Sequence, residues 1–259
     1  MKDKRWIVLS VFIIAILTAC IFNFTGIKRN KYLPDESAKQ TEQPEKAADL
    51  PLRGKIIVVD PGHGLNNISD KERLSPKSDK KKPAYVSGTA GKNQTEEQLN
   101  LACGLILKEK LEALGAEVHM TRSGHDAEMS NIGRAEFANN LGADVSVKLH
   151  ADGSENKELH GISVLVPAEG CLDSGLFESC ERLGMCLLDS VVKETAADNR
   201  GLSYREDMTG FNWSKIPTAL IEMGFMTNPE EDALMETEEY RSKLMDGAVS
   251  GLLKYFENR

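Results

Sequence analysis

The hydrophobic positions of this chain follow two spacings from residue 54 onward. Short runs of consecutive apolar residues are typical of strands buried on both faces of a parallel sheet. Longer segments repeat apolar residues every three or four positions, which predicts helices with one buried face. The predicted strands are 55–59, 116–121, 144–149, 161–166 and 218–222, and the predicted helices are 95–114, 131–141, 174–195 and a last one within 240–256.

This alternation of strands and helices predicts an α/β fold. We expect a single three-layer domain over 54–259, with a mostly parallel central sheet flanked by helices. The helix boundaries carry their own signals: Thr95 and Gln98 form a capping-box pattern, and Gly115 is a typical helix stop.

Two segments of the domain are predicted to lie outside regular structure. Residues 65–93 form a long polar stretch with three adjacent lysines at 80–82, and we expect a functional or mobile loop there. The lysines could attract an anionic polymer, although a solvated loop tip is the commoner use of such a run. The second segment, 199–202, is predicted to be a turn.

The first 27 residues indicate where the protein acts. Lys2, Lys4 and Arg5 precede an uncharged run over 6–22 that continues to about Ile27. A basic start before a long apolar run is an export signal or a signal anchor, and this run is about long enough to span a bilayer. We expect an uncleaved membrane anchor, with a cleaved signal peptide as the alternative. Either reading places the rest of the chain outside the cytoplasm.

A lipoprotein is a further alternative for the same segment. Residues 17–20 (LTAC) resemble a bacterial lipoprotein cleavage box, which would make Cys20 a lipidated N-terminus. The apolar residues that follow the cysteine argue against this interpretation, because a lipoprotein tether is normally polar.

Composition adds three limits. Residues 28–53 are polar and lack apolar periodicity, which predicts a flexible linker. The net charge of −8, with no concentrated basic face, argues against a nucleic-acid binder. The five cysteines have irregular spacing without a CxxC pair, and only a Cys171–Cys186 disulfide is left open.

Four residues with candidate chemistry follow or begin predicted elements. His63, His150 and Glu222 stand at the ends of three buried strands, and Glu96 is the first residue of a helix. Two imidazoles and one carboxylate supply a three-ligand catalytic zinc site, and a second carboxylate can accept a proton from water. Simpler roles compete: His63 as a loop histidine, and Glu96 as a partner of the helix dipole.

Other charged residues have weaker claims. His119 lies within a predicted strand and His125 in a loop, so neither is expected to be a ligand. Arg122 could bind substrate, but an ion pair with an acid of the domain is at least as common for such a residue. Arg134, on the helix over 131–141, is expected to be another structural ion-pair former.

Four segments, taken together and in order, resemble the zinc-dependent N-acetylmuramoyl-L-alanine amidases: 59–64 (VDPGHG), 96–101 (EEQLNL), 143–151 (ADVSVKLHA) and 219–228 (ALIEMGFMTN). The resemblance extends from about residue 54 to the C-terminus. It implies hydrolysis of the amide between N-acetylmuramic acid and L-alanine in peptidoglycan, an extracytoplasmic substrate.

Carried over to this sequence, the resemblance makes His63, Glu96 and His150 the Zn²⁺ ligands and Glu222 the catalytic carboxylate. The expected partners are peptidoglycan and, through the N-terminal segment, the membrane; a protein activator is left open. Two alternatives remain, a zinc peptidase that cuts stem peptides and a non-catalytic wall-binding module.

The chain departs from the family pattern in three places. Leu65 stands where a second glycine commonly follows, Lys148 replaces a serine before His150, and Asp152 replaces an asparagine after it. None of these removes a ligand. We expect Lys148 and Asp152 to add charges close to the metal.

Overall fold

The computed structural model describes residues 50–65, 69–126 and 129–257. The predicted anchor at 1–27, and the linker apart from 50–53, lie outside the described residues. Within the described ranges, no helix is long and apolar enough to cross a membrane. Leu52, which the prediction placed in the linker, is fully buried in the main core, so the folded part begins before residue 54.

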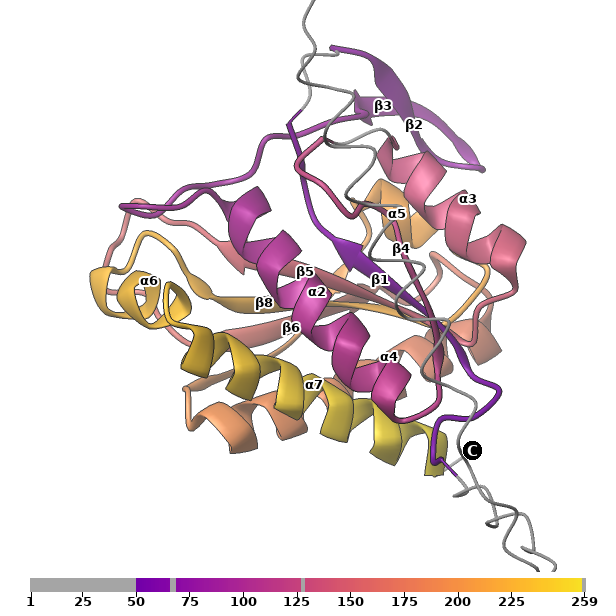
Figure 1. Ribbon diagram of the computed structural model, residues 1–259. Helices are drawn as coiled ribbons and strands as arrows, with labels where there is room; N and C mark the ends of the chain where they lie inside the picture. The colour runs from indigo at the N-terminus through magenta and orange to yellow at the C-terminus, as the bar shows by residue number, and fades with distance from the viewer. Residues whose placement is uncertain (1–49, 66–68, 127–128, 258–259) are drawn as a thin grey trace, which may run out of the picture. The chain divides into compact units, whose positions relative to one another are not determined.

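A six-stranded sheet forms the centre of the domain (Figure 1). In spatial order the strands are β4 (Glu117–Met120), β1 (Ile56–Pro61), β5 (Val145–Asp152), β8 (Thr218–Phe225), β6 (Ile162–Pro167) and β7 (Asn199–Arg205). The first four are parallel to their neighbours, while β6 runs antiparallel to β8 and parallel to β7. The mostly parallel sheet that the sequence predicted is therefore confirmed.

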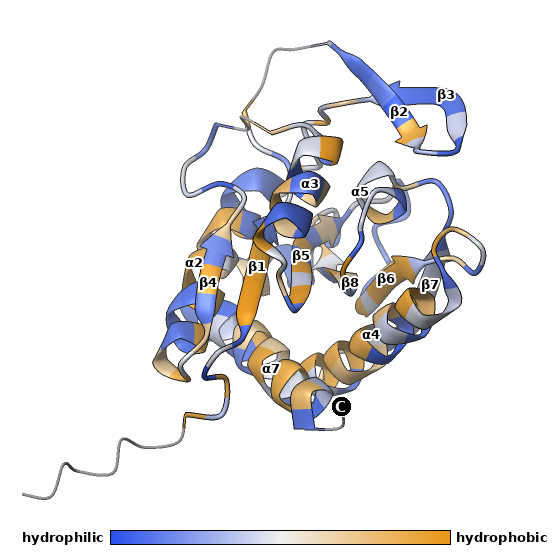
Figure 2. Ribbon diagram, turned by 90° about the vertical axis from the view of Figure 1, so that its right-hand side faces the viewer, coloured by the Kyte–Doolittle hydropathy of each residue, from blue (hydrophilic) through white to orange (hydrophobic). Residues whose placement is uncertain are grey.

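Helices cover both faces of this sheet, as the three-layer prediction required (Figure 2). The main core lies between one face and three long amphipathic helices: α2 (Glu96–Ala113), α4 (Ser174–Thr195) and α7 (Glu238–Glu257). Two smaller apolar clusters pack the opposite face against α3 (Asn131–Leu141) and the short α5 (Thr209–Asn212). A further short helix, α6 (Pro229–Met235), follows β8.

The helix boundaries agree with their sequence signals. At the start of α2 the Thr95 amide donates to Gln98 Oε1 at 3.0 Å, which completes the predicted capping box. The start of α3 is capped by the Ser130 hydroxyl, and Gly142 ends it in the left-handed conformation with φ of 62°. Local sequence therefore sets where the helices stop.

Two predictions of irregular structure were wrong. Residues 65–93 contain an antiparallel hairpin of β2 (Lys71–Ser75) and β3 (Ser78–Pro83), and β3 carries the three lysines. The hairpin has almost no apolar pattern because only Leu74 is buried in it. The predicted turn at 199–202 is the first part of β7, an edge strand that is only half-buried.

Further differences concern strand length and cysteines. β5 and β8 each run beyond their predicted ends, so that His150 and Glu222 lie within strands. Pairing between the two strands continues past these residues, with a register shift after His150. Cys171 and Cys186 are free, so the disulfide left open by the sequence is not formed.

Candidate metal centre

His63 is presented on a tight turn directly after β1. Its backbone is left-handed, with φ of 59°, which is uncommon for a residue other than glycine. Two buried arginines hold this turn by its carbonyl groups. Arg134 Nη2 donates to the His63 carbonyl at 2.6 Å, and Arg122 Nε donates to the Pro61 carbonyl at 2.9 Å.

The imidazole of His63 is oriented by the segment that follows β3. Its Nδ1 lies 2.7 Å from the Val86 carbonyl, which can only accept a hydrogen bond, so Nδ1 carries the proton. Nε2 is thereby left with its lone pair, 2.9 Å from Glu96 Oε1. This is the usual arrangement of a metal-binding histidine, whose second nitrogen donates to a carbonyl.

Glu96 enters the site from the first turn of α2. Its carboxylate is buried and accepts from two backbone amides, Thr89 to Oε2 at 2.9 Å and Ala151 to Oε1 at 3.2 Å. The Asn100 amide, one turn further along α2, also donates to Oε1 at 3.3 Å. These contacts direct the carboxylate toward the end of the sheet.

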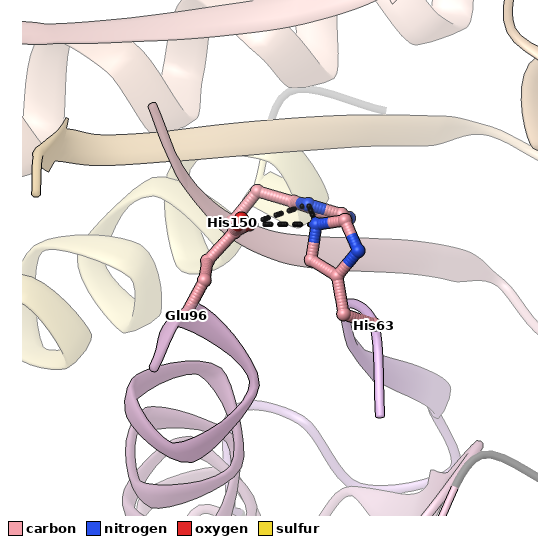
Figure 3. A group of neighbouring side chains, drawn as sticks. All are labelled: His63, Glu96 and His150. Carbon is pink, nitrogen blue, oxygen red and sulfur yellow. Dashed lines mark hydrogen bonds and ion pairs between the residues drawn. The ribbon is translucent and has the colours of Figure 1, made fainter. Parts of the chain in front are cut away.

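His150 on β5 completes the group (Figure 3). Its Nδ1 lies 2.9 Å from Glu96 Oε1 and 3.0 Å from His63 Nε2. Gly62 packs so closely on the ring that a Cβ there would lie 2.2 Å from His150 Nε2. One donor atom from each of the three side chains lies within 4.8 Å of the others, as a shared metal ion requires.

The three groups also control one another's charge. Burial raises the pKa of Glu96, but hydrogen bonds with His150 and His63 outweigh burial and leave that pKa well below its usual range. Burial disfavours a charged His63, yet its contacts with Glu96 raise the pKa of this imidazole. For His150 burial prevails, and the pKa is lowered. An ionised carboxylate beside a neutral imidazole suits a divalent cation.

Glu222 lies beside this group on β8, paired in register with His150. Burial, followed by the charges of Glu96 and Asp152, raises its pKa well above the usual value, while Arg205 opposes the shift. Within the described part of the chain, Oε2 of Glu222 is buried and has no hydrogen-bond partner. Such a carboxyl group is suited to hold and release a proton.

All four residues line one pocket of about 930 Å³. Its walls come from the segment after β3, from the ends of β5 and β8, and from the region around α5. The lining also includes Leu165, Phe211 and Leu220, which form a small apolar cluster. The cavity is large enough for part of a polymeric substrate.

A buried ion cluster is joined to the metal centre through Arg134, which contacts both Asp60 and the His63 carbonyl. Asp60 accepts from Arg134 Nη1 at 2.6 Å, from Lys148 Nζ at 2.5 Å and from the Thr121 hydroxyl at 2.5 Å. Burial raises the pKa of Asp60, but the charges of Lys148 and Arg134 hold it far below its usual range. Lys148 therefore neutralises Asp60 in addition to standing near the metal site.

The sequence missed several members of this site. In the sequence Asp60 stands out only as part of the 59–64 motif, and Val86 and Thr89 lie in the predicted loop, where no periodicity marks a backbone contact. The three remaining histidines of the chain pair with nearby acids: His119 with Glu117, His125 with Glu97 and His160 with Asp198. The ion-pair role considered for Arg134 is confirmed by its contact with Asp60.

Known proteins resemble both the sequence and the fold. A family model described as N-acetylmuramoyl-L-alanine amidase matches residues 57–254. An N-acetylmuramoyl-L-alanine amidase of Mycobacterium tuberculosis is 29% identical over 208 residues, covering 78% of this chain and 86% of the relative. The probable cell wall amidase LytH of Staphylococcus epidermidis is 27% identical over 80% of this chain, which spans 60% of LytH. Among solved structures, the N-acetylmuramyl-L-alanine amidase Ami1 of Mycobacterium abscessus superposes with a TM-score of 0.73 at 28% identity, covering 79% of this chain and 100% of Ami1.

Proposed function

The chain belongs to the N-acetylmuramoyl-L-alanine amidase family, and from this premise we propose that it cleaves peptidoglycan with the help of Zn²⁺. The bond is the amide between the lactyl group of N-acetylmuramic acid and the L-alanine of the stem peptide. One observation carries the proposal: three side chains that could hold a metal ion line the same pocket as Glu222, whose buried Oε2 has no hydrogen-bond partner among the described residues.

Zinc fits the donor set of His63, Glu96 and His150. Two imidazole nitrogens and one carboxylate oxygen are a common ligand set of catalytic zinc, which leaves a further position for water or substrate. When bound, zinc supplies Lewis acidity, which polarises a carbonyl and makes water more acidic. The protein's part is to hold the three donors in place through Val86, Thr89 and the close contact at Gly62.

Glu222 is the proposed proton carrier. Its carboxylate takes a proton from the attacking water and, in the protonated form, delivers that proton to the nitrogen of the leaving L-alanine. The raised pKa of Glu222 favours the second half of this cycle, because burial and the neighbouring acidic charges favour the protonated form of the carboxyl group. No described residue forms a hydrogen bond with Oε2, which leaves this atom available to both steps.

The place of action is proposed from the substrate and the first segment together. Peptidoglycan lies outside the cytoplasm, and the N-terminal signal predicts export with membrane anchoring. A tethered domain on a polar linker would reach the wall from the membrane surface. Mass spectrometry of the mature N-terminus, with fractionation of the cells, distinguishes an anchor from a cleaved or lipidated form.

Product analysis tests the activity. Purified protein loaded with zinc is incubated with muropeptides, and the masses of the products are determined by mass spectrometry. We expect a free stem peptide with L-alanine at its N-terminus, and no release after treatment with a chelator. Products cut only between amino acids would establish the peptidase alternative, and wall binding without hydrolysis under any metal condition would establish the non-catalytic one.

A further inference from the structure

We propose that Arg205 binds an ionised carboxylate on the peptide part of the substrate, so that the enzyme selects stem peptides by charge. This inference rests on the proposed function. Arg205 is the last residue of β7 and lines the same pocket as Glu222 and the metal triad.

The guanidinium of Arg205 is fixed on one side and open on the other. Nε and Nη2 donate to the two oxygens of Asp207 at 2.9 and 3.1 Å. Asp207 is itself held from the hairpin, because Lys82 Nζ donates to its backbone carbonyl at 2.5 Å. In the described ranges Nη1 of Arg205 has no hydrogen-bond partner, and 40% of the side chain is exposed. A planar, oriented N–H edge of this kind suits a carboxylate.

The other cations of the pocket are already engaged. Arg134 and Lys148 are buried and share Asp60, and Lys82 is bound to Asp207. Arg205 is thus the lining cation that combines exposure with an open guanidinium edge.

The chemistry of the substrate assigns this edge to the peptide. In the intact substrate the lactyl carboxyl of the muramic acid is consumed in the amide, so the sugars carry no carboxylate. Free carboxylates remain only on the peptide, beyond the L-alanine. The wall formed by β7 and α5, where Arg205 lies, is therefore the peptide side of the pocket.

A matched pair of substrates tests this assignment. One muropeptide carries a free carboxylate on the residue after L-alanine, and the other carries the primary amide at the same position. We expect the full-length enzyme to prefer the acid, and Arg205→Ala to lower kcat/KM for the acid by about 10- to 100-fold with little effect on the amide. Arg205→Lys should restore part of the preference, since it keeps the charge and loses the planar fork.

A binding measurement keeps the inference testable if neither substrate is cleaved, an outcome that would count against the proposed function alone. Calorimetry on Glu222→Gln protein, with and without Arg205→Ala, should give tighter binding of the acid only when Arg205 is present. Arg200→Ala is the matched control, because Arg200 lies on the same strand but stacks on Phe225. Equal losses for acid and amide, or no preference in the unmodified protein, would overturn the assignment.

Discussion

At the scale of single residues, the site depends on how closely neighbouring groups approach. The absence of a side chain at Gly62 lets the ring of His150 lie against the backbone after β1. The left-handed backbone of His63 is held by Arg134, and its imidazole by the Val86 carbonyl. Each of these contacts restricts the position of a donor atom in the metal-free protein. Less conformational entropy is therefore lost when the metal binds.

Gly62→Ala should weaken zinc binding. The added Cβ would lie 2.2 Å from His150 Nε2, so the ring must move away from the other two donors. We expect affinity for zinc to fall by about 10- to 100-fold, measured by competition with a chromophoric chelator. Gly133→Ala is the control, because the nearest atom to its Cβ lies at 3.5 Å. Unchanged affinity in Gly62→Ala would show that the close contact does not position His150.

Glu222→Gln should retain zinc and the fold but lose activity. The amide keeps the shape of the side chain and cannot carry the proton, so kcat should fall by about 10²- to 10⁴-fold. Metal analysis and circular dichroism of the same sample would exclude loss of zinc or structure. Glu158→Gln, at an exposed position outside the main pocket, is the control. Strong residual turnover would mean that another group is the base.

At the scale of elements, the metal centre is a junction of separate pieces of secondary structure. β1, α2 and β5 supply the donors, and β8 supplies the neighbouring carboxyl group. The Asp60 cluster joins β1 to β5 through Lys148 and to α3 through Arg134. Because the buried Asp60 carboxylate has its two cationic partners on β5 and α3, the loss of one ion pair would leave an uncompensated charge between these elements and β1.

Asp60→Asn should destabilise the domain in a pH-dependent way. The pKa of Asp60 is lowered in the folded state, so its contribution is fully present above the ordinary value of 3.8 and is lost progressively as pH falls from there toward the much lower folded value. At pH 7 we expect a loss of about 3–5 kcal/mol in the free energy of unfolding, since two buried cations lose their charged partner. The difference between variant and parent should shrink below about pH 4.

Denaturant unfolding at pH 7 and pH 3 measures this difference. Asp79→Asn serves as the control, because Asp79 is fully exposed on the hairpin and pairs only loosely with Arg73. A penalty for Asp60→Asn that stays constant across this range would contradict the electrostatic explanation.

At the scale of the whole molecule, the donors are far apart in the chain and meet only in the folded state. Metal binding should therefore stabilise the domain as a unit, by about 2.7 kcal/mol at a free zinc concentration one hundred times the Kd. For a domain of this size, we expect zinc to raise the Tm by about 5–10 °C.

His63→Ala tests this coupling. The variant should lose the zinc-dependent rise in Tm, which is measured by calorimetry with and without a chelator. Metal analysis should also find markedly less zinc in the variant. His160→Ala should keep the full rise, since His160 pairs with Asp198 away from the main pocket. Zinc at the parent's stoichiometry in His63→Ala would remove this residue from the ligand set.

The sequence alone determined much of the architecture. Continuous apolar runs identified the sheet strands of the core, and helical spacing with local caps placed α3 and α4 at the observed boundaries. Both signals are local, because a buried strand or one helical face needs a fixed pattern of neighbours. The same patterns placed His63, His150 and Glu222 at strand ends and Glu96 at a helix start, which was enough to predict that they meet.

The tertiary structure decided what no local pattern encodes. The hairpin β2–β3 and the edge strand β7 bury little apolar surface, so their sequences resemble loops. The contacts of Val86 and Thr89 use backbone atoms, which every residue shares. The pairing of Lys148 with Asp60 joins positions 88 residues apart. Such contacts depend on distances in the folded chain, and these distances also give Arg205 its place in the wall of the pocket.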